Sequence, residues 1–248
     1  MNTLSNYDEF RRACSEDMTS LQQDFMKLYN IESYEHWYYD HGMGVFHFKS
    51  DDGRNLYFKY VGVGTFSNEK NTWMWSWHNN STPEKVKRGM NRVKEYGESN
   101  GFERLTEGLI DGDGYTGWEF TTITAKLLNA IGMYRVPSGH LHAYFVFTAE
   151  VAQEVYDEMK EWQVKCDIHE SGRASFVCQH LLSGEDKGFH ETFDSDPAIE
   201  QEDDYQAWCD ECEELWMMEK EWTDVFRAFV NLRIVCDECY FVIKERNQ

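Results

Sequence analysis

Apolar residues at helical spacing open the chain. From residue 6 to residue 29 they recur three or four positions apart, at Phe10, Cys14, Met18, Leu21, Phe25 and Leu28. Because an α-helix makes one turn in about 3.6 residues, this spacing places them on one face. We therefore predict an amphipathic helix over 6–29.

Strand patterns follow this helix. Segments 35–41, 44–48 and 56–66 are rich in aromatic and β-branched residues and are separated by short polar or glycine-containing turns. The next segment reads Thr72-Trp73-Met74-Trp75-Ser76-Trp77, and its period of two places all three tryptophans on one face of a strand. The patterns predict an antiparallel meander. The tryptophans are expected in its core, with the aromatic floor of a groove as the alternative.

Further helices and strands complete the first domain. Thr82 and Pro83 form a helix start, with an N-cap and a proline in the first turn, and predict a helix to residue 98. A second helix is expected over 116–131, followed by strands over 133–136 and 141–147, and then by a helix that starts at 148 or 149 and ends near 162. Residues 1–165 are therefore interpreted as an α+β domain, an antiparallel meander packed on helices.

The pattern changes after Lys165. Segments 174–182 and 188–193 predict a β-hairpin joined through Ser183-Gly184. A helix from near Trp208 past Trp222, a strand over 232–235 and a helix from Tyr240 complete the expectation. Residues 166–248 are thus predicted to form a small β-hairpin and helix module.

The cysteines of this module predict a zinc site. Four of the chain's seven cysteines form two Cys-x-x-Cys pairs, Cys209/Cys212 and Cys236/Cys239. Such a turn points two sulfurs at one ion, and zinc takes four tetrahedral thiolate or imidazole ligands. The odd number of cysteines and the absence of a secretion signal argue against a disulfide framework and favour a cytoplasmic protein. We therefore expect one structural zinc bound by all four thiolates.

Other cysteines and histidines leave alternatives open. Cys178 and His180 lie two positions apart, so on a strand they would share a face. Three roles stay open for this pair. The two residues complete a mixed cysteine and histidine site for the same zinc, belong to a second site with Cys166 and His169, or have a structural role only. His140 and His142 also alternate and could serve a metal, although spacing assigns them no third ligand.

Charge bears on the class of partner. The chain of 248 residues carries a formal net charge of −21. Sixteen acidic residues and two lysines lie between Glu185 and Asp224, a net of −14 for that segment. Phosphate backbones and anionic lipids would repel such a protein, which argues against nucleic-acid and membrane binding. No run approaches the roughly 18 apolar residues of a membrane span. The acidic segment is a solvated surface or a surface for a basic protein partner.

Two sets of motifs resemble known families. Thr72–Trp77, Tyr96-Gly97 and Tyr134-Arg135-Val136-Pro137 resemble a bacterial family of unknown function whose signature is a Thr-Trp-x-Trp-x-Trp strand. The second set is Val177-Cys178-Gln179-His180-Leu181, Ala207-Trp208-Cys209-x-x-Cys212-Glu213 and Cys236-x-x-Cys239-Tyr240, and it is similar to a second, uncharacterised bacterial module. These resemblances imply a bacterial, cytoplasmic, zinc-binding protein and no particular reaction.

The sequence favours a protein that is not an enzyme. Our leading hypothesis is an acidic, zinc-stabilised cytoplasmic protein that binds a basic protein partner, and an immunity protein that neutralises a toxin is one such class. The alternative is a metal-dependent hydrolase with zinc at Cys178/His180 or at His140/His142.

Overall fold

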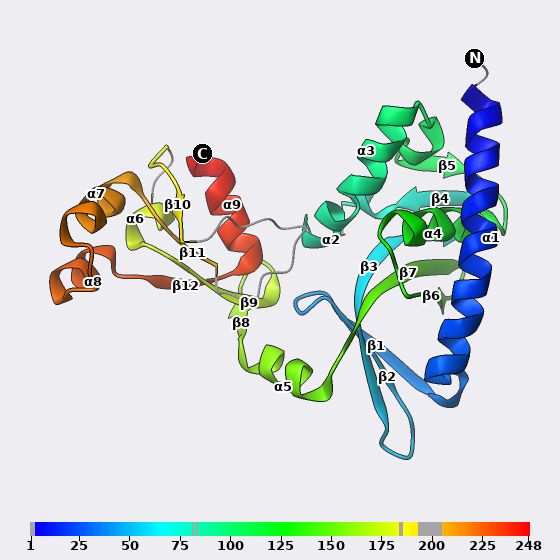
Figure 1. Ribbon diagram of the computed structural model, residues 1–248, viewed down its shortest axis with the longest axis horizontal. Coiled ribbons are helices and arrows are strands. Elements are labelled where there is room, and N and C mark those ends of the chain that lie inside the picture. Colours follow the sequence, from blue (N-terminus) through cyan, green and yellow to red (C-terminus); the bar gives the residue numbers. More distant parts are fainter. Residues whose placement is uncertain (1–2, 81, 83, 184–185, 193–204) are drawn as a thin grey trace. The chain divides into compact units, whose positions relative to one another are not determined.

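The chain consists of two compact units, Met1–Tyr156 and Asp157–Gln248, here called unit 1 and unit 2 (Figure 1). The computed structural model describes residues 3–80, 82, 84–183, 186–192 and 205–248. The division falls earlier in the chain than the boundary expected after Lys165. The reason is that residues 163–166 form a strand that pairs within unit 2.

The described residues of unit 1 form a seven-stranded antiparallel sheet. Its strands are β1 (His36–Asp40), β2 (Val45–Lys49), β3 (Asn55–Ser67), β4 (Thr72–Trp75), β5 (Leu109–Asp111), β6 (Gly132–Ser138) and β7 (Leu141–Val151). The long strand β3 pairs with β2 and then β4 along one edge, and with β7 along the other. The α+β class and the antiparallel meander predicted from the sequence are confirmed.

Helices α1 and α4 pack against each other and against this sheet (Figure 1). The α-helices of unit 1 are α1 (Thr3–Tyr29), α2 (Glu84–Gly89), α3 (Asn91–Asn100), α4 (Thr116–Leu127) and α5 (Gln153–Glu161), the last of which crosses into unit 2. Short 3-10 turns lie at Ile31–Ser33, Ser76–His78 and Glu103–Leu105. The helix expected over 82–98 is divided at Met90, and the one expected from 148 starts later because β7 continues to Val151.

Two of the three patterned tryptophans lie in the core. Trp73 and Trp75 are fully buried, and their rings pack edge to face with centroids 5.4 Å apart. The strand ends at Trp75, so Trp77 lies in the following 3-10 turn. Its half-buried ring stacks on Trp75 at 4.4 Å. Trp73 and Trp75 are therefore part of the core, and Trp77 covers the edge of this pair.

Unit 2 is organised around one strand, β9 (Glu170–Val177). Its other strands are β8 (Gln163–Cys166), β10 (His190–Glu191), β11 (Gln206–Trp208) and β12 (Arg233–Cys236), and its helices are α6 (Gln179–Leu182), α7 (Asp210–Glu219), α8 (Asp224–Val230) and α9 (Asp237–Asn247). Strand β9 is antiparallel to β8 and β12 and parallel to β11.

The hairpin predicted between 174–182 and 188–193 is wrong. Strand β9 ends at Val177, residues 179–182 form helix α6, and β10 pairs with β11 instead of β9. The predicted joint at Gly184 and residues 193–204 of the acidic segment lie outside the described residues. None of the described helices is long and apolar enough to cross a membrane.

The helices of unit 2 also differ from expectation. The single helix expected past Trp222 is two helices, because Lys220 adopts a left-handed conformation (φ 53°) that ends α7. The last helix begins at Asp237, before Tyr240, and buries Tyr240 and Phe241 in the core of the unit.

Candidate metal centres

Both Cys-x-x-Cys pairs occupy the same local structure. Each reads Cys-Asp-Glu-Cys, follows a strand and begins a helix, α7 for Cys209/Cys212 and α9 for Cys236/Cys239. The first cysteine is the N-cap residue, with extended backbone, and the second lies in the first helical turn. The amides at a helix N-terminus favour negative charge, but burial and the neighbouring thiols together raise the pKa of all four of these cysteines.

The structure separates the two pairs. Cys236 and Cys239 lie with Cys166 and His169, a set that we call group A. Cys209 and Cys212 lie with Cys178 and His180, which we call group B. The expected single site of four thiolates therefore differs from the structure, which has two sets of three cysteines and one histidine. In each set the ligand atoms lie within 4.8 Å of one another.

Strand directions explain this separation. Strand β11 runs parallel to β9, with Ala207 opposite Val177, so Cys209 emerges at the carboxyl end of β9 beside Cys178. Strand β12 runs antiparallel to β9, with Cys236 opposite Ala174, so its cysteines emerge toward the amino end of β9. The two helix starts are thus carried to different ends of the same strand.

Group A joins a turn after β8 to the start of α9. The Nδ1 atom of His169 lies 3.3 Å from the Cys236 sulfur, 3.5 Å from the Cys239 sulfur and 3.7 Å from the Cys166 sulfur. The sulfurs of Cys166 and Cys239 are 3.7 Å apart. Cys236 is buried, whereas the other three side chains are partly exposed.

Group B joins the start of α6 to the start of α7. The Nδ1 atom of His180 lies 3.2 Å from the Cys212 sulfur and 3.7 Å from the Cys209 sulfur. The backbone N–H of Cys209 donates to the Cys178 sulfur at 3.4 Å. All three cysteines are buried and belong to the hydrophobic core of unit 2. The imidazole packs against the Phe229 ring with centroids 4.9 Å apart.

These separations fit a tetrahedral zinc ion. With Zn–S bonds of about 2.3 Å and Zn–N bonds of about 2.0–2.1 Å, tetrahedral geometry separates two sulfurs by about 3.8 Å and a sulfur from a nitrogen by about 3.5 Å. The measured sulfur–sulfur distance and the average sulfur–nitrogen distance lie close to these values. Both groups could therefore hold a metal ion without rearrangement of their ligands.

Mutual contact perturbs the thiols of group B. A hydrogen bond with Cys212, aided by backbone N–H groups and opposed by burial, lowers the pKa of Cys178 to about 5. The same contact, together with burial, raises the pKa of Cys212 strongly. One thiolate is thus stabilised by a proton that its neighbour retains. A bound cation would replace such protons, because metals bind the deprotonated thiolate.

The thiols of group A also have pKa values shifted in opposite directions. Burial opposes ionisation of Cys166, but backbone N–H groups of Ile168 and His169 and the neighbouring thiols lower its pKa to about 7. Burial raises the pKa of Cys236. Each group therefore combines one thiol whose pKa is lowered with neighbouring thiols whose pKa is raised.

Sequence reasoning found some of these residues and missed their partners. Cys178 and His180 do lie together, but at the start of a helix and not on one face of a strand. Cys166 and His169 are expected from the sequence only as companions of Cys178 and His180, whereas they lie with Cys236 and Cys239. The number of motifs in the sequence does indicate two sites. Two Cys-x(1–2)-His elements and two Cys-Asp-Glu-Cys turns together supply two complete sets of four ligands.

The remaining histidine pair lies outside both groups. His140 is in the turn before β7, and its Nε2 atom is 3.8 Å from a carboxylate oxygen of Glu69. His142 is on β7, where its Nε2 atom lies 3.3 Å from the side-chain amide of Asn68. Within the described ranges, neither belongs to a cluster of three or more metal-binding side chains.

Comparison with known proteins assigns unit 1 to a protein family. Residues 8–150, more than half of the chain, match a family of unknown function, DUF6882. The chain belongs to this family. The matched region ends before both groups A and B. The resemblance to a family of unknown function expected from the sequence is therefore confirmed for unit 1 alone. No curated protein and no solved structure matches the chain.

Thiol reactivity distinguishes the cysteines of the two units. Cys14 is buried in unit 1, and burial raises its pKa to about 11, so at pH 8 it stays a protonated, inaccessible thiol. We expect a thiol reagent such as iodoacetamide to leave all seven cysteines slow to react in the metal-loaded chain. After chelation, the six cysteines of groups A and B should react rapidly while Cys14 stays protected, as peptide mass spectrometry would show. Fast labelling of Cys14 under these conditions would show that chelation also opens the core of unit 1, contrary to this expectation.

Proposed function

We propose that this protein is a non-enzymatic binding protein whose unit 2 is held together by two structural zinc ions and offers an acidic surface to a basic protein partner. The zinc part of this proposal rests on the pair of Cys3His groups, whose sulfur–nitrogen distances in both groups, and sulfur–sulfur distance in group A, lie close to tetrahedral separations.

The donor set supports zinc over other common ions. Three thiolates and one imidazole are soft ligands that suit zinc, whereas magnesium and calcium prefer oxygen. With two zinc ions bound, each group would carry a charge of −1, from one divalent cation and three thiolates. Two cations would thus remove the repulsion among six thiolates and fix four separate chain segments in a small unit.

The geometry supports a structural role over a catalytic one. A catalytic zinc keeps a coordination position for water or substrate, whereas four protein ligands close the coordination sphere. Cys178 and His180, proposed from the sequence as a hydrolase site, belong to such a four-ligand set. No observation favours the hydrolase alternative at His140 and His142.

Charge supports the basic partner. Asp157–Gln248 contains 24 acidic and 9 basic residues, a net of −15, whereas Met1–Tyr156 contains 21 and 15, a net of −6; the two values sum to −21. Such a field attracts a basic protein and accelerates the association. An immunity protein that neutralises a basic toxin is one specific form of this proposal.

Metal content tests the zinc part. We expect elemental analysis of the purified full chain to find about two zinc ions per molecule. Cys166→Ser, in group A, should remove one of them without disturbing group B. The control Cys14→Ser, outside both groups, should retain both. One zinc in the wild-type chain, or two in Cys166→Ser, would contradict the assignment.

Salt-dependent capture tests the partner part. The zinc-loaded chain, immobilised and exposed to a lysate of its source cell, should retain basic proteins at low salt and release them as salt rises. A charge-matched acidic protein serves as the control for nonspecific ion exchange. Retention of the same proteins by that control, or of acidic proteins alone, would contradict a specific basic partner.

A further inference from the structure

Two neighbouring helices of unit 2 expose large apolar side chains. Helices α7 and α8 and their connection leave solvent-accessible Met217 (59%), Met218 (75%), Trp222 (39%), Val225 (65%) and Phe229 (38%). We call these five residues the α7–α8 apolar surface. Large apolar side chains exposed together on two helices that pack against each other often mark an interaction site.

Buried aromatic and aliphatic residues support this surface. Val225 and Phe229 lie four residues apart on α8 and so share a face, while Phe226 and Val230 of the same helix are buried. The Trp222 ring packs against Phe226 with centroids 5.1 Å apart. Phe229 contacts the imidazole of His180, which belongs to group B. Binding here would therefore need little reorganisation, provided that group B is intact.

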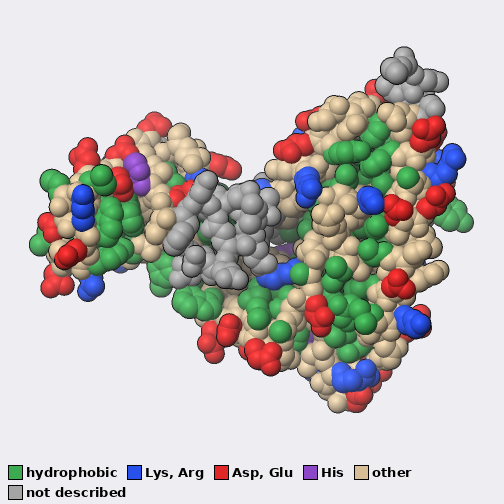
Figure 2. Space-filling view, viewed as in Figure 1, with side chains coloured by type: hydrophobic (Ala, Val, Ile, Leu, Met, Phe, Trp, Pro, Cys, Tyr) green, Lys and Arg blue, Asp and Glu red, His purple; other side chains and the backbone are tan. Residues whose placement is uncertain are grey.

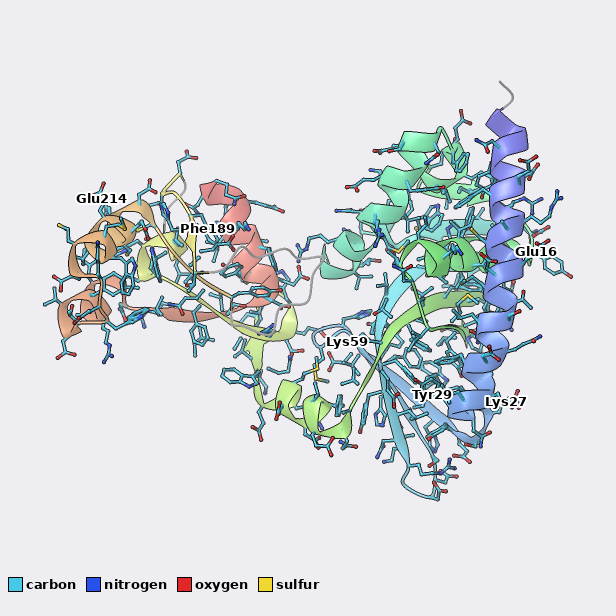
Figure 3. All side chains as sticks on the ribbon, in the orientation of Figure 1. Glu16, Lys27, Tyr29, Lys59, Phe189 and Glu214 are labelled. Carbon is cyan, nitrogen blue, oxygen red and sulfur yellow. The ribbon has the colours of Figure 1, made fainter. Side chains whose placement is uncertain are left out.

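Exposed acidic side chains lie on the same elements as this surface. Residues 210–230 contain seven acidic and two basic residues, a net of −5. Glu211, Glu214 and Glu219 are exposed, and Glu214 extends outward from α7 in Figure 3. Figure 2 shows hydrophobic and acidic side chains interspersed over the part of unit 2 that α7 and α8 form.

We propose that the α7–α8 apolar surface binds an amphipathic, positively charged helix of a partner protein. Apolar residues of such a helix would cover Met218, Trp222 and Val225, and its lysine or arginine residues would meet the surrounding carboxylates. The flexible side chains of Met217 and Met218 adapt to the apolar residues they contact. This inference rests on the proposed basic partner and assigns it a surface and a secondary structure.

Charge decides between this occupant and two others. A second copy of the chain would bring a net of −5 against the same net charge, and an anionic membrane would likewise be repelled. A basic helix satisfies both the apolar and the acidic features of the surface.

A defined peptide pair tests the surface on the zinc-loaded full chain. The probe is a synthetic amphipathic helix of leucine and lysine, and the control peptide keeps every leucine but replaces each lysine with glutamate. Isothermal titration should show binding of the lysine peptide and none of the glutamate peptide. The double variant Met218→Gln/Val225→Asn should weaken binding about tenfold or more. Leu28→Gln, at an equally exposed side chain of unit 1, should leave it unchanged.

Each contrary outcome has a separate meaning. If the lysine peptide binds the double variant as tightly as the wild type, basic partners bind elsewhere, and the surface assignment fails while the proposed function stands. If the wild type does not bind the lysine peptide at all, both fail. If sedimentation shows a wild-type dimer that the double variant abolishes, the occupant is a second copy and the inference is overturned.

Discussion

Removing metal from the full chain should unfold unit 2 and leave unit 1 folded. Six of the side chains that bring the elements of unit 2 together are the cysteines of the two groups that could hold a metal ion, and three of them lie in its hydrophobic core. Structural zinc contributes about 10–16 kcal/mol of apparent binding free energy at neutral pH, which matches or exceeds the whole stability of a typical domain. Unit 1 has its own core around Trp73, Trp75 and Phe120 and holds neither group.

The measurement is chelator titration monitored by limited proteolysis and mass spectrometry. Fragments of unit 2 should appear while the region 3–156 stays resistant, and added zinc should restore protection. Cys212→Ser, which removes a fully buried ligand of group B, should mimic chelation. Cys239→Ser, at a partly exposed ligand of group A, should have the smaller effect. Protection of unit 2 in the metal-free chain would show that its fold does not depend on the ion.

In unit 1, replacing Trp75 with alanine should cost about 3–5 kcal/mol of unfolding free energy. The side chain is fully buried, packs on Phe120 with ring centroids 4.6 Å apart, and donates its indole N–H to the carbonyl oxygen of Arg104 at 3.2 Å. Truncation therefore opens a cavity and leaves a backbone acceptor without this donor.

Trp77→Ala provides the matched control, since this ring is half-buried and stacks on the edge of the same cluster. Urea unfolding of the two variants, followed by tyrosine and tryptophan fluorescence, should give a clearly larger loss for Trp75→Ala. Equal losses would mean that the two indoles contribute alike, contrary to their difference in burial.

Periodicity predicted most elements of unit 1 because their apolar residues face one continuous core. The helical spacing of Phe10, Cys14, Met18 and Leu21 needs only one buried face to be recognised, and α1 has that face. Trp77 shows the limit of the method. Alternation continues through it, yet the strand stops at Trp75, because the chain turns there and the pattern of apolar residues does not encode that turn.

The ligand sets could be predicted only in part. Spacing predicts Cys209/Cys212 and Cys236/Cys239 as candidate metal-binding turns, because two sulfurs three residues apart at a helix start point the same way. It does not reveal which turns meet. That depends on whether β11 and β12 run parallel or antiparallel to β9, a tertiary property that no local pattern carries.

The order of the ligands along the chain has a consequence for how unit 2 is made. Group A draws on residues 166–169 and 236–239, and group B on residues 178–180 and 209–212, so B is nested inside A. His180 and Cys212 are 32 residues apart, whereas Cys166 and Cys239 are 73 apart. Closing the shorter loop first costs less entropy, and it shortens the effective loop that A must close.

We therefore expect assembly from the inside outward. During synthesis, group B is complete once Cys212 has left the ribosome, while the second pair of group A is still to come. A metal ion bound to group B at that stage would hold β9, α6 and α7 together before β12 and α9 are synthesised. The later segments would then pack onto a part of unit 2 that has already folded.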